Sequence, residues 1–199
     1  MSEHYFSEKP QSKSKPKTWD YSLRGNVYTF TSDIGVFSKN EVDFGTRLLI
    51  ESFEEPRIQG HILDMGCGYG PIGITLARSF PERHVIMADV NERAVKLARE
   101  NAKENQVDSI EVIESDLFSE LEDDAFAAIL TNPPIRAGKH IVHRIFEDSQ
   151  KALLPHGELW VVIQKKQGAP SAQKKLASLF SSVDIVARRK GYYILRAVK

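Results

Sequence analysis

Residues 62–73 read Ile62-Leu-Asp-Met-Gly-Cys-Gly-Tyr-Gly-Pro-Ile-Gly73, and they join a predicted strand at 61–64 to a predicted helix at 71–80. Glycines let a backbone turn tightly and let a ligand approach it closely. In open sheets of parallel strands, ligands bind beyond the carboxyl ends of the strands. The stretch therefore predicts a cofactor-binding loop, and a purely structural turn is the alternative.

From this loop onward, predicted strands and helices alternate along the chain. Strands are predicted at 61–64, 84–89, 110–114, 126–131 and 158–163, and helices at 71–80, 91–105, 139–153 and 171–180 with Asn91 and Ser171 as N-caps. This alternation predicts a mainly parallel sheet with helices on both faces. Only Lys190-Gly191 separates two further strands at 183–189 and 192–198, so these must form an antiparallel hairpin. The fold class is therefore α/β, a three-layer Rossmann-like sheet of seven strands that ends in an antiparallel hairpin.

The N-terminal part adds smaller elements. Residues 1–18 are expected to form a mobile arm, because residues 7–17 are rich in Ser, Lys, Pro and Gln. Two short strands around Arg24-Gly25-Asn26 predict a β-hairpin. Ser38-Lys-Asn-Glu41 has the form of a capping box and predicts a helix from there to about Phe53. Residues 19–199 are expected to form one domain.

Composition points to the cytoplasm. No apolar run reaches the ~20 residues of a membrane span, and the N-terminus has no signal pattern. Cys67 is the single cysteine, which excludes an internal disulfide. We therefore expect a cytoplasmic protein without membrane contact, while its oligomeric state stays open.

Charge is distributed unevenly. Residues 1–40 hold six Lys/Arg and four Asp/Glu, residues 41–131 hold eight and nineteen, and residues 132–199 hold thirteen and four, so net charges of +2, −11 and +9 sum to zero. A basic segment attracts phosphate groups locally, whatever the net charge. The last third therefore favours contact with a nucleic acid, and ordinary solvated faces are the alternative.

Asn132-Pro-Pro-Ile135 follows the predicted strand at 126–131. Two successive prolines lack backbone N–H groups and stiffen the chain. The carbonyls of Thr131, Asn132 and Pro133, together with the Asn132 side chain, then form a rigid group of acceptors suited to an NH2 group. A plain turn is the alternative.

Three acids stand at the ends of neighbouring strands. Asp89 lies about 20 residues beyond the glycines, where an acid binds ribose hydroxyls in dinucleotide-binding folds. Asp64 directly precedes the glycines, where it suits a cationic amine better than a pyrophosphate. Asp116 ends the third strand, and a cap or turn is the alternative there. A ligand with ribose, exocyclic amine and positive charge fits all three, and S-adenosylmethionine has these groups.

This ordered set of motifs resembles the class I S-adenosylmethionine-dependent methyltransferases over about residues 19–199. More narrowly, Gly35-Val-Phe-Ser38 and Asn132-Pro-Pro-Ile-Arg-Ala-Gly138 resemble the catalytic domain of the small-subunit (16S) ribosomal RNA guanine-N2 methyltransferases. Members of that family often carry a second, N-terminal methyltransferase-like domain that these residues do not include, so the RNA target is expected to differ.

The resemblance implies that S-adenosylmethionine is the cofactor, with its methionyl part at the glycine loop, its ribose at Asp89 and its adenine amine at Asp116. The implied cofactor-binding residues are Asp64, Gly66, Cys67, Gly68, Gly70, Asp89, Val90, Asn91, Asp116, Leu117 and Asn132. Asn132, Pro133 and Pro134 are the implied catalytic residues, which hold the target amine.

Substrate contacts are expected next to this corner. Many relatives that modify amines have an aromatic residue after the two prolines, where this chain has Ile135. Phe37 is therefore the expected base clamp, with core packing as the alternative, and Arg136 and Lys139 are expected to meet phosphate. No metal site is expected, since His140 and His143 lack further ligands.

The expected reaction is N-methylation of an exocyclic amine of a nucleobase, most favourably guanine N2 in small-subunit ribosomal RNA, with RNA or a small ribosomal subunit as partner. The same chemistry on DNA adenine or on protein glutamine is one alternative. A non-catalytic RNA-binding module that retains the cofactor site is another. A nicotinamide-dependent oxidoreductase is disfavoured by Asp64 and by the terminal hairpin.

Overall fold

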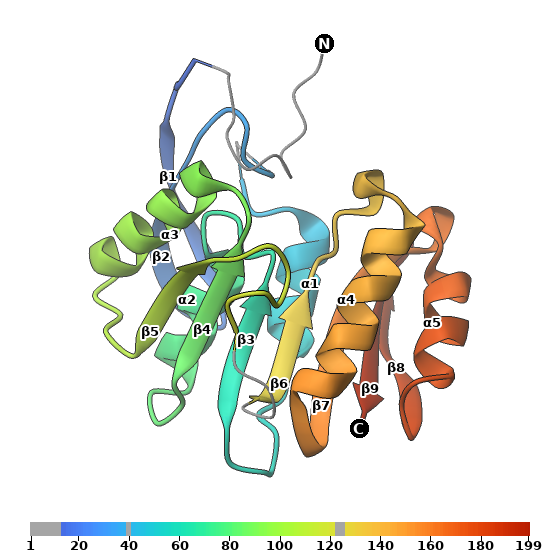
Figure 1. Cartoon of the computed structure of the whole chain (residues 1–199). Helices are drawn as coiled ribbons and strands as arrows, with labels where there is room; N and C mark the ends of the chain where they lie inside the picture. Colours follow the sequence, from blue (N-terminus) through green and yellow to red (C-terminus); the bar gives the residue numbers. More distant parts are fainter. Residues whose placement is uncertain (1–12, 39–40, 122–125) are drawn as a thin grey trace.

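A seven-stranded sheet forms the centre of the computed structural model, which describes residues 13–38, 41–121 and 126–199 (Figure 1). Its strands lie in the order β5 (Ile110–Glu114), β4 (Val85–Asp89), β3 (His61–Met65), β6 (Phe126–Thr131), β7 (Leu153–Gln164), β9 (Tyr192–Val198) and β8 (Ser182–Arg189). Neighbours from β5 to β7 are parallel, whereas β9 is antiparallel to β7 and β8. The predicted mainly parallel sheet with a terminal hairpin is confirmed.

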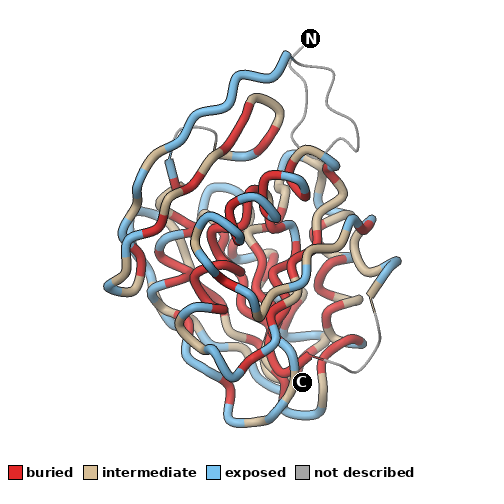
Figure 2. The backbone as a smooth tube through the Cα atoms, turned by 90° about the vertical axis from the view of Figure 1, so that its left-hand side faces the viewer, coloured by how far each residue is buried: buried red, intermediate tan, exposed pale blue. Residues whose placement is uncertain are grey.

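Helices cover both faces of this sheet. One face carries α1 (Phe44–Ser52), α2 (Pro71–Ser79) and α3 (Glu92–Glu104), and the other carries α4 (Lys139–Ala152) and α5 (Ala169–Ala177). Successive residues of β3 point to opposite faces of the sheet. Ile62 packs in the hydrophobic core under α1, α2 and α3, and Leu63 packs in the core under α4 and α5. Figure 2 shows buried residues along the strands and the inner sides of the helices. Among the described residues, no helix is long and apolar enough to cross a membrane.

The N-terminal hairpin is confirmed as β1 (Lys17–Leu23) and β2 (Asn26–Ser32), which pair antiparallel. The first two residues of β1 had been assigned to the arm, so the strand begins earlier than expected. Ser14 and the Lys15 amide donate hydrogen bonds to Asp33. The rest of the expected arm, residues 1–12, lies outside the described part of the chain.

Two asparagines, one in α3 and one at its C-cap, hold the hairpin against the domain. Asn101 accepts from the Thr31 amide (2.9 Å) and donates to its carbonyl (2.9 Å), and Asn105 does the same with Thr29 (3.0 and 2.8 Å). The Asn101 side chain also donates to the Tyr69 carbonyl in the glycine loop at 2.8 Å. One buried amide therefore connects hairpin, helix and loop.

Asn101→Ala is expected to destabilise the protein by about 3 kcal/mol, because buried backbone groups of Thr31 and Tyr69 lose their partners. Asn105→Ala removes bonds at a more exposed position and is expected to cost about 1 kcal/mol. Urea unfolding followed by circular dichroism measures both values. Equal destabilisation by the two substitutions would contradict the connecting role of Asn101.

The start of α1 differs from the prediction. The helix begins at Phe44, and the Asp43 carboxylate caps it by accepting from Gly45 N at 2.9 Å and Thr46 N at 3.4 Å. The start expected at Ser38 is therefore wrong. Ser38 has a φ of 55° and its hydroxyl donates to the Glu41 carbonyl, so it belongs to a turn. Residues 39 and 40, inside the expected capping box, lie outside the described residues.

The start of α5 also differs. Its N-cap is Gly168, with a φ of 104°, so the N-cap predicted at Ser171 is wrong. Pro170 lies in the first turn of the helix, where its missing N–H has no intrahelical partner to lose. The N-cap predicted at Asn91 is confirmed, since its side chain accepts from Arg93 N and Ala94 N.

Candidate active site

A cavity opens at the carboxyl ends of β3, β4, β5 and β6. It encloses about 980 Å³, including open solvent at its mouth, within the roughly 300–1,000 Å³ typical of small-molecule sites. The residues predicted for the site that line it are Phe37, Gly66, Cys67, Gly68, Asp89, Val90, Asp116, Leu117, Asn132, Pro133 and Pro134. The predicted residues that do not line it are Asp64, Gly70, Asn91, Ile135, Arg136 and Lys139.

The glycines of the loop serve different purposes. Gly66 has a φ of 76°, and a Cβ placed there would meet no atom within 4 Å, so the space beside it is open to a ligand. Gly73 has no such φ, but a Cβ there would lie 2.4 Å from the Met87 side chain. A glycine at position 66 therefore leaves room for a ligand in the cavity. A glycine at position 73 lets α2 pack closely on β4.

Asp89 ends β4 in the cavity wall. Its carboxylate accepts from Gly68 N at 2.8 Å and from Asn91 N at 2.9 Å. Burial raises the pKa of this carboxyl, and the backbone hydrogen bonds oppose the shift. A carboxylate has about four acceptor positions, so Asp89 can hold the glycine loop and still accept from ligand hydroxyl groups.

Asp64 lies behind the loop, where the cavity does not reach it. Its side chain is fully buried, and Oδ2 accepts from Gly73 N at 2.9 Å. The N-cap of α2 is Gly70, which has no side chain to satisfy the first amides of the helix. Asp64 therefore supplies this cap from the neighbouring strand and does not line the cavity.

Stability of the cofactor-free protein is expected to fall as pH rises from about 4 to about 7, since burial, with a smaller effect of Asp89, raises the pKa of Asp64 to about 7. In this range the unfolded chain ionises this carboxyl while the folded chain keeps it protonated. The loss is roughly 4 kcal/mol at most, at about 1.4 kcal/mol per pKa unit. Asp64→Asn should reduce this pH dependence in urea unfolding at several pH values. An unchanged slope in the variant would rule out Asp64 as its source.

Asp116 follows β5 in a tight turn. The Ser115 hydroxyl donates to the Leu117 carbonyl at 2.7 Å, and Leu117 has a φ of 52°. The turn leaves the Asp116 side chain exposed at the cavity, and Leu117 adds an apolar wall. An exposed carboxylate beside an apolar wall suits a heterocycle that carries an amine.

Asn91 supports the site from behind. It is fully buried, caps α3, and donates through Nδ2 to the Gly35 carbonyl at 2.9 Å. The Arg93 side chain donates to the Ile34 carbonyl, and its Nε lies 3.8 Å from Asp33. These contacts fix the loop that carries Phe37 above the start of α3.

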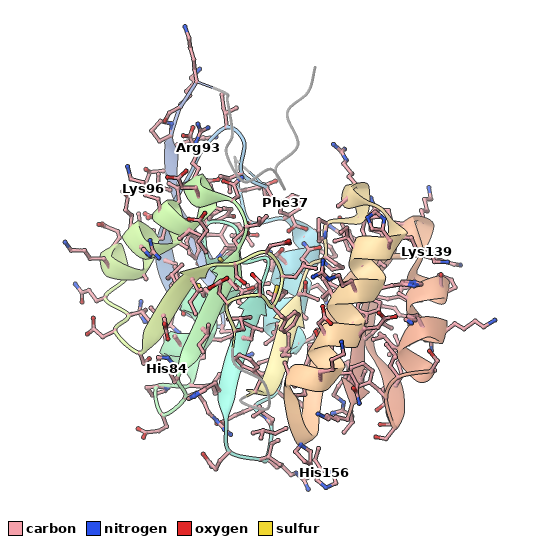
Figure 3. All side chains as sticks on the ribbon, viewed as in Figure 1. Phe37, His84, Arg93, Lys96, Lys139 and His156 are labelled. Atoms are coloured by element: carbon pink, nitrogen blue, oxygen red, sulfur yellow. The ribbon has the colours of Figure 1, made fainter. Side chains whose placement is uncertain are left out.

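Phe37 stands at the cavity and is 40 % exposed, so it belongs to neither hydrophobic core. Figure 3 shows it above the carboxyl ends of the central strands. An aromatic ring at the mouth of a polar cavity can stack on a planar ligand. The alternative that Phe37 packs in the core is therefore not supported, and its role as the base clamp stays a prediction.

The Asn-Pro-Pro corner follows β6. Asn132 Nδ2 donates to Thr46 Oγ1 at 3.0 Å and to Asp43 Oδ2 at 3.3 Å. With its NH2 group used in this way, the amide leaves its carbonyl oxygen as an acceptor. Among the described residues, the backbone carbonyl of Pro133 makes no hydrogen bond either. Two acceptors are thus available at one rigid corner.

Asp43 and Thr46 line the cavity but were not predicted. The signal was present in Asp43-Phe-Gly-Thr46, since an acid just before a helix is a common N-cap. A helix that starts at Ser38 places Asp43 inside the helix, so the expected start excludes Asp43 as the N-cap. No pattern in the sequence, however, showed that the cap lies beside Asn132.

Cys67 is a buried free thiol in the glycine loop. Burial raises the pKa of the Cys67 thiol well above its ordinary value, with smaller effects of Asp89 and Asp64, so the thiol stays neutral. Within the described ranges, no group of three or more His, Cys, Asp or Glu side chains is arranged to hold a metal.

Ile135, Arg136 and Lys139 lie just outside the cavity. They belong to the short helix η1 (Ile135–Ala137) and to the first turn of α4. Arg136 and Lys139 are exposed, and Ile135 packs partly against the core beneath α4.

A family model supplies the context for this geometry. The model of the methyltransferase small domain matches residues 27–196. The chain belongs to this family. Its members depend on S-adenosylmethionine, and S-adenosylmethionine is the cofactor of this methyltransferase domain.

Relatives of this methyltransferase domain include proteins of different lengths. An uncharacterized protein, YbxB of Bacillus subtilis (strain 168), is 60% identical over 100% of both chains. The ribosomal RNA large subunit methyltransferase G of Shewanella amazonensis is 32% identical over 96% of this chain and 50% of its own. The solved T. thermophilus 16S rRNA N2 G1207 methyltransferase, in complex with AdoMet and guanosine, shares the fold with a TM-score of 0.83 and 24% identity, over 96% and 52% of the two chains. The chain thus spans about half the length of these ribosomal RNA methyltransferases.

Proposed function

We propose that this protein transfers a methyl group from S-adenosylmethionine to an exocyclic amine of a base in ribosomal RNA, with guanine N2 as the favoured position. The observation that carries the proposal is the Asn132 amide, whose NH2 group is bonded to Thr46 and Asp43. Its oxygen is thereby kept as an acceptor in the wall of a cavity that the glycine loop and Asp89 also line.

The cavity has the groups that S-adenosylmethionine needs. The open space at Gly66 would admit the methionyl part, Asp89 would accept from the ribose hydroxyls, and Asp116 would accept from the adenine amine. Val90 and Leu117 provide apolar walls for the ring, and Cys67 is a neutral part of the loop. When bound, the cofactor supplies a methyl group on a positively charged sulfur.

The corner would activate the substrate by holding it. An exocyclic amine on a purine is a weak nucleophile, because its lone pair is delocalised into the ring. If Asn132 Oδ1 and the Pro133 carbonyl accept its two N–H groups, the nitrogen becomes more pyramidal and its lone pair more localised. Rigid, correctly oriented acceptors lower the barrier without reorganising during the reaction. The methyl–sulfur bond would break as the new N–C bond forms, and the nitrogen, acidic only from then on, would release its proton to water, so no strong base is required beforehand.

The surroundings of the corner favour RNA. Lys165 N donates to the Gly191 carbonyl at 2.8 Å, so the short helix η2 (Lys165–Gln167) lies beside the turn between β8 and β9. Lys165, Lys166 and Lys190 therefore gather at the carboxyl edge of the sheet, where the cavity also opens. Lys190 Nζ lies 4.8 Å from the centre of the Phe44 ring. Exposed cations together with aromatic rings are typical of surfaces that bind phosphates and unstacked bases.

Transfer of tritium from labelled S-adenosylmethionine tests the proposal. Separate reactions would contain isolated small subunits, large subunits, naked ribosomal RNA, DNA and ribosomal proteins. Label in an RNA band, followed by nuclease digestion to N2-methylguanosine, is the expected result. Label only in DNA adenine or in protein glutamine would replace this substrate with one of those. Tight binding of RNA and cofactor without transfer to any of them would indicate a non-catalytic module.

A further inference from the structure

A second hollow lies next to the catalytic corner, between the N-terminal ends of α4 and α5. It encloses about 580 Å³, including its open mouth. Pro134 lines the first cavity and Ile135 lines this hollow, and successive Cα atoms are about 3.8 Å apart. The linings of the two hollows therefore meet at the Pro134–Ile135 peptide, so a ligand that spans this peptide could place one group in each.

The floor of the hollow is apolar. Side chains from η1, α4, β7 and α5 form it, namely those of Ile135, Val142, Ile163 and Ala172. No carboxylate of the described residues lines the hollow. A flat apolar group is therefore favoured there, and an anionic group meets no like charge in the wall.

The rim carries a cation, an amide and a hydroxyl, and the imidazole of His143 also lines the hollow. Within the described ranges, the side chains of Lys139, Gln167 and Ser171 make no hydrogen bond or ion pair with the protein, whereas Lys175 nearby is paired with Glu147. Figure 3 shows Lys139 at the end of α4 that faces the carboxyl edge of the sheet. These three groups are therefore available to a ligand.

We propose that this hollow binds the nucleotide adjacent to the target in a single-stranded segment of RNA. Lys139 pairs with a phosphate of that nucleotide, the base lies on the apolar floor, and the Gln167 amide meets the edge of the base. Side-chain amides commonly bond base edges, and RNA recognition favours bases that are unstacked and separated. The inference rests on the proposed function, because it takes the first cavity as the site of the target base.

Binding of a labelled short single-stranded RNA to the full chain with S-adenosylhomocysteine, measured by fluorescence anisotropy at several salt concentrations, tests the subsite. Lys139→Ala should weaken binding several-fold and reduce the slope of log K against log salt by about 0.7, the value for one contact to a single strand. Ser171→Trp fills the hollow, so it should weaken binding at an unchanged slope. Gln167→Ala provides a second, smaller change should the tryptophan variant fail to fold.

Two variants serve as matched controls. Lys103→Ala removes the same charge on α3, and Ser178→Trp adds the same ring at the far end of α5. Both should bind RNA as the native chain does, and calorimetry should give all folded variants the native affinity for S-adenosylhomocysteine. If Lys139→Ala and Ser171→Trp behave like these controls, or the native chain binds no RNA, the subsite is excluded.

Two further outcomes distinguish a nucleotide subsite from a simple anion site and from the proposed methyl transfer. Displacement of RNA by inorganic phosphate alone at constant ionic strength would reveal a plain anion site and overturn the nucleotide assignment. RNA binding that responds to the variants as expected, without methyl transfer to any substrate, would refute the proposed function and support the subsite.

Discussion

Asn132→Ala is expected to slow methyl transfer by about 10²-fold or more, the scale of removing one preorganised polar group from a catalytic site. Cofactor affinity should change by no more than a few-fold, because the glycine loop, Asp89 and Asp116 are untouched. The loss arises from the missing acceptor, which leaves the lone pair of the target amine delocalised. Single-turnover rates with saturating RNA measure the first quantity, and calorimetry with S-adenosylhomocysteine measures the second.

Thr46→Val provides a graded comparison. It keeps Asn132 but removes the acceptor at 3.0 Å, so that only Asp43, at 3.3 Å, orients the amide. We expect a rate between those of the native chain and Asn132→Ala, with a native melting temperature in both variants. Native turnover in a folded Asn132→Ala variant would sink the proposed mechanism.

Asp89→Ala is expected to weaken cofactor binding by about 10- to 100-fold, since a hydrogen bond to a charged group contributes roughly 1.5–3 kcal/mol. Two effects act together. The ribose hydroxyls lose their acceptor, and the Gly68 amide loses the carboxylate that now holds it at 2.8 Å. Calorimetric titration with S-adenosylmethionine gives the affinity.

Two further substitutions test whether the loss of cofactor affinity is specific to the Asp89 carboxylate. Asp89→Asn keeps an oxygen that can accept from one amide, so it should lose less affinity than Asp89→Ala. Asp108→Ala removes an exposed acid after α3 and should leave binding unchanged. Native affinity in Asp89→Ala would remove this residue from the ribose-binding role.

The order and type of the main elements could be predicted because strand and helix periodicities are local properties of sequence. Residues 126–131 read as a buried strand, since both faces of a central parallel strand are covered and such a strand is mostly apolar. Lys190-Gly191 identified the hairpin because two residues cannot make a parallel crossover. These inferences needed no knowledge of tertiary contacts.

The roles of individual polar residues depended on tertiary contacts and could not be read in the same way. Asp64 and Asp89 both end strands beside the glycine loop, yet one caps α2 in the interior and the other faces the cavity. Asp64 accepts from Gly73 N in α2, whereas Asp89 accepts from Gly68 N and Asn91 N beside the cavity, and these partners are set by the folded chain. Likewise, the exposure of Phe37 follows from loop contacts to Asn91 and Arg93, which are distant in sequence.

The paired amides of Asn101 and Asn105 have a consequence for association between molecules. Four residues of helix advance about 6 Å, close to the roughly 6.8 Å between alternate residues of a strand. The side chains therefore meet Thr29 and Thr31 as an adjoining strand would, and occupy N–H and C=O groups of the outer edge of β2. An exposed strand edge is a template for intermolecular pairing. Here the two asparagines occupy that template on β2, so this edge of the hairpin is closed to a strand from another molecule.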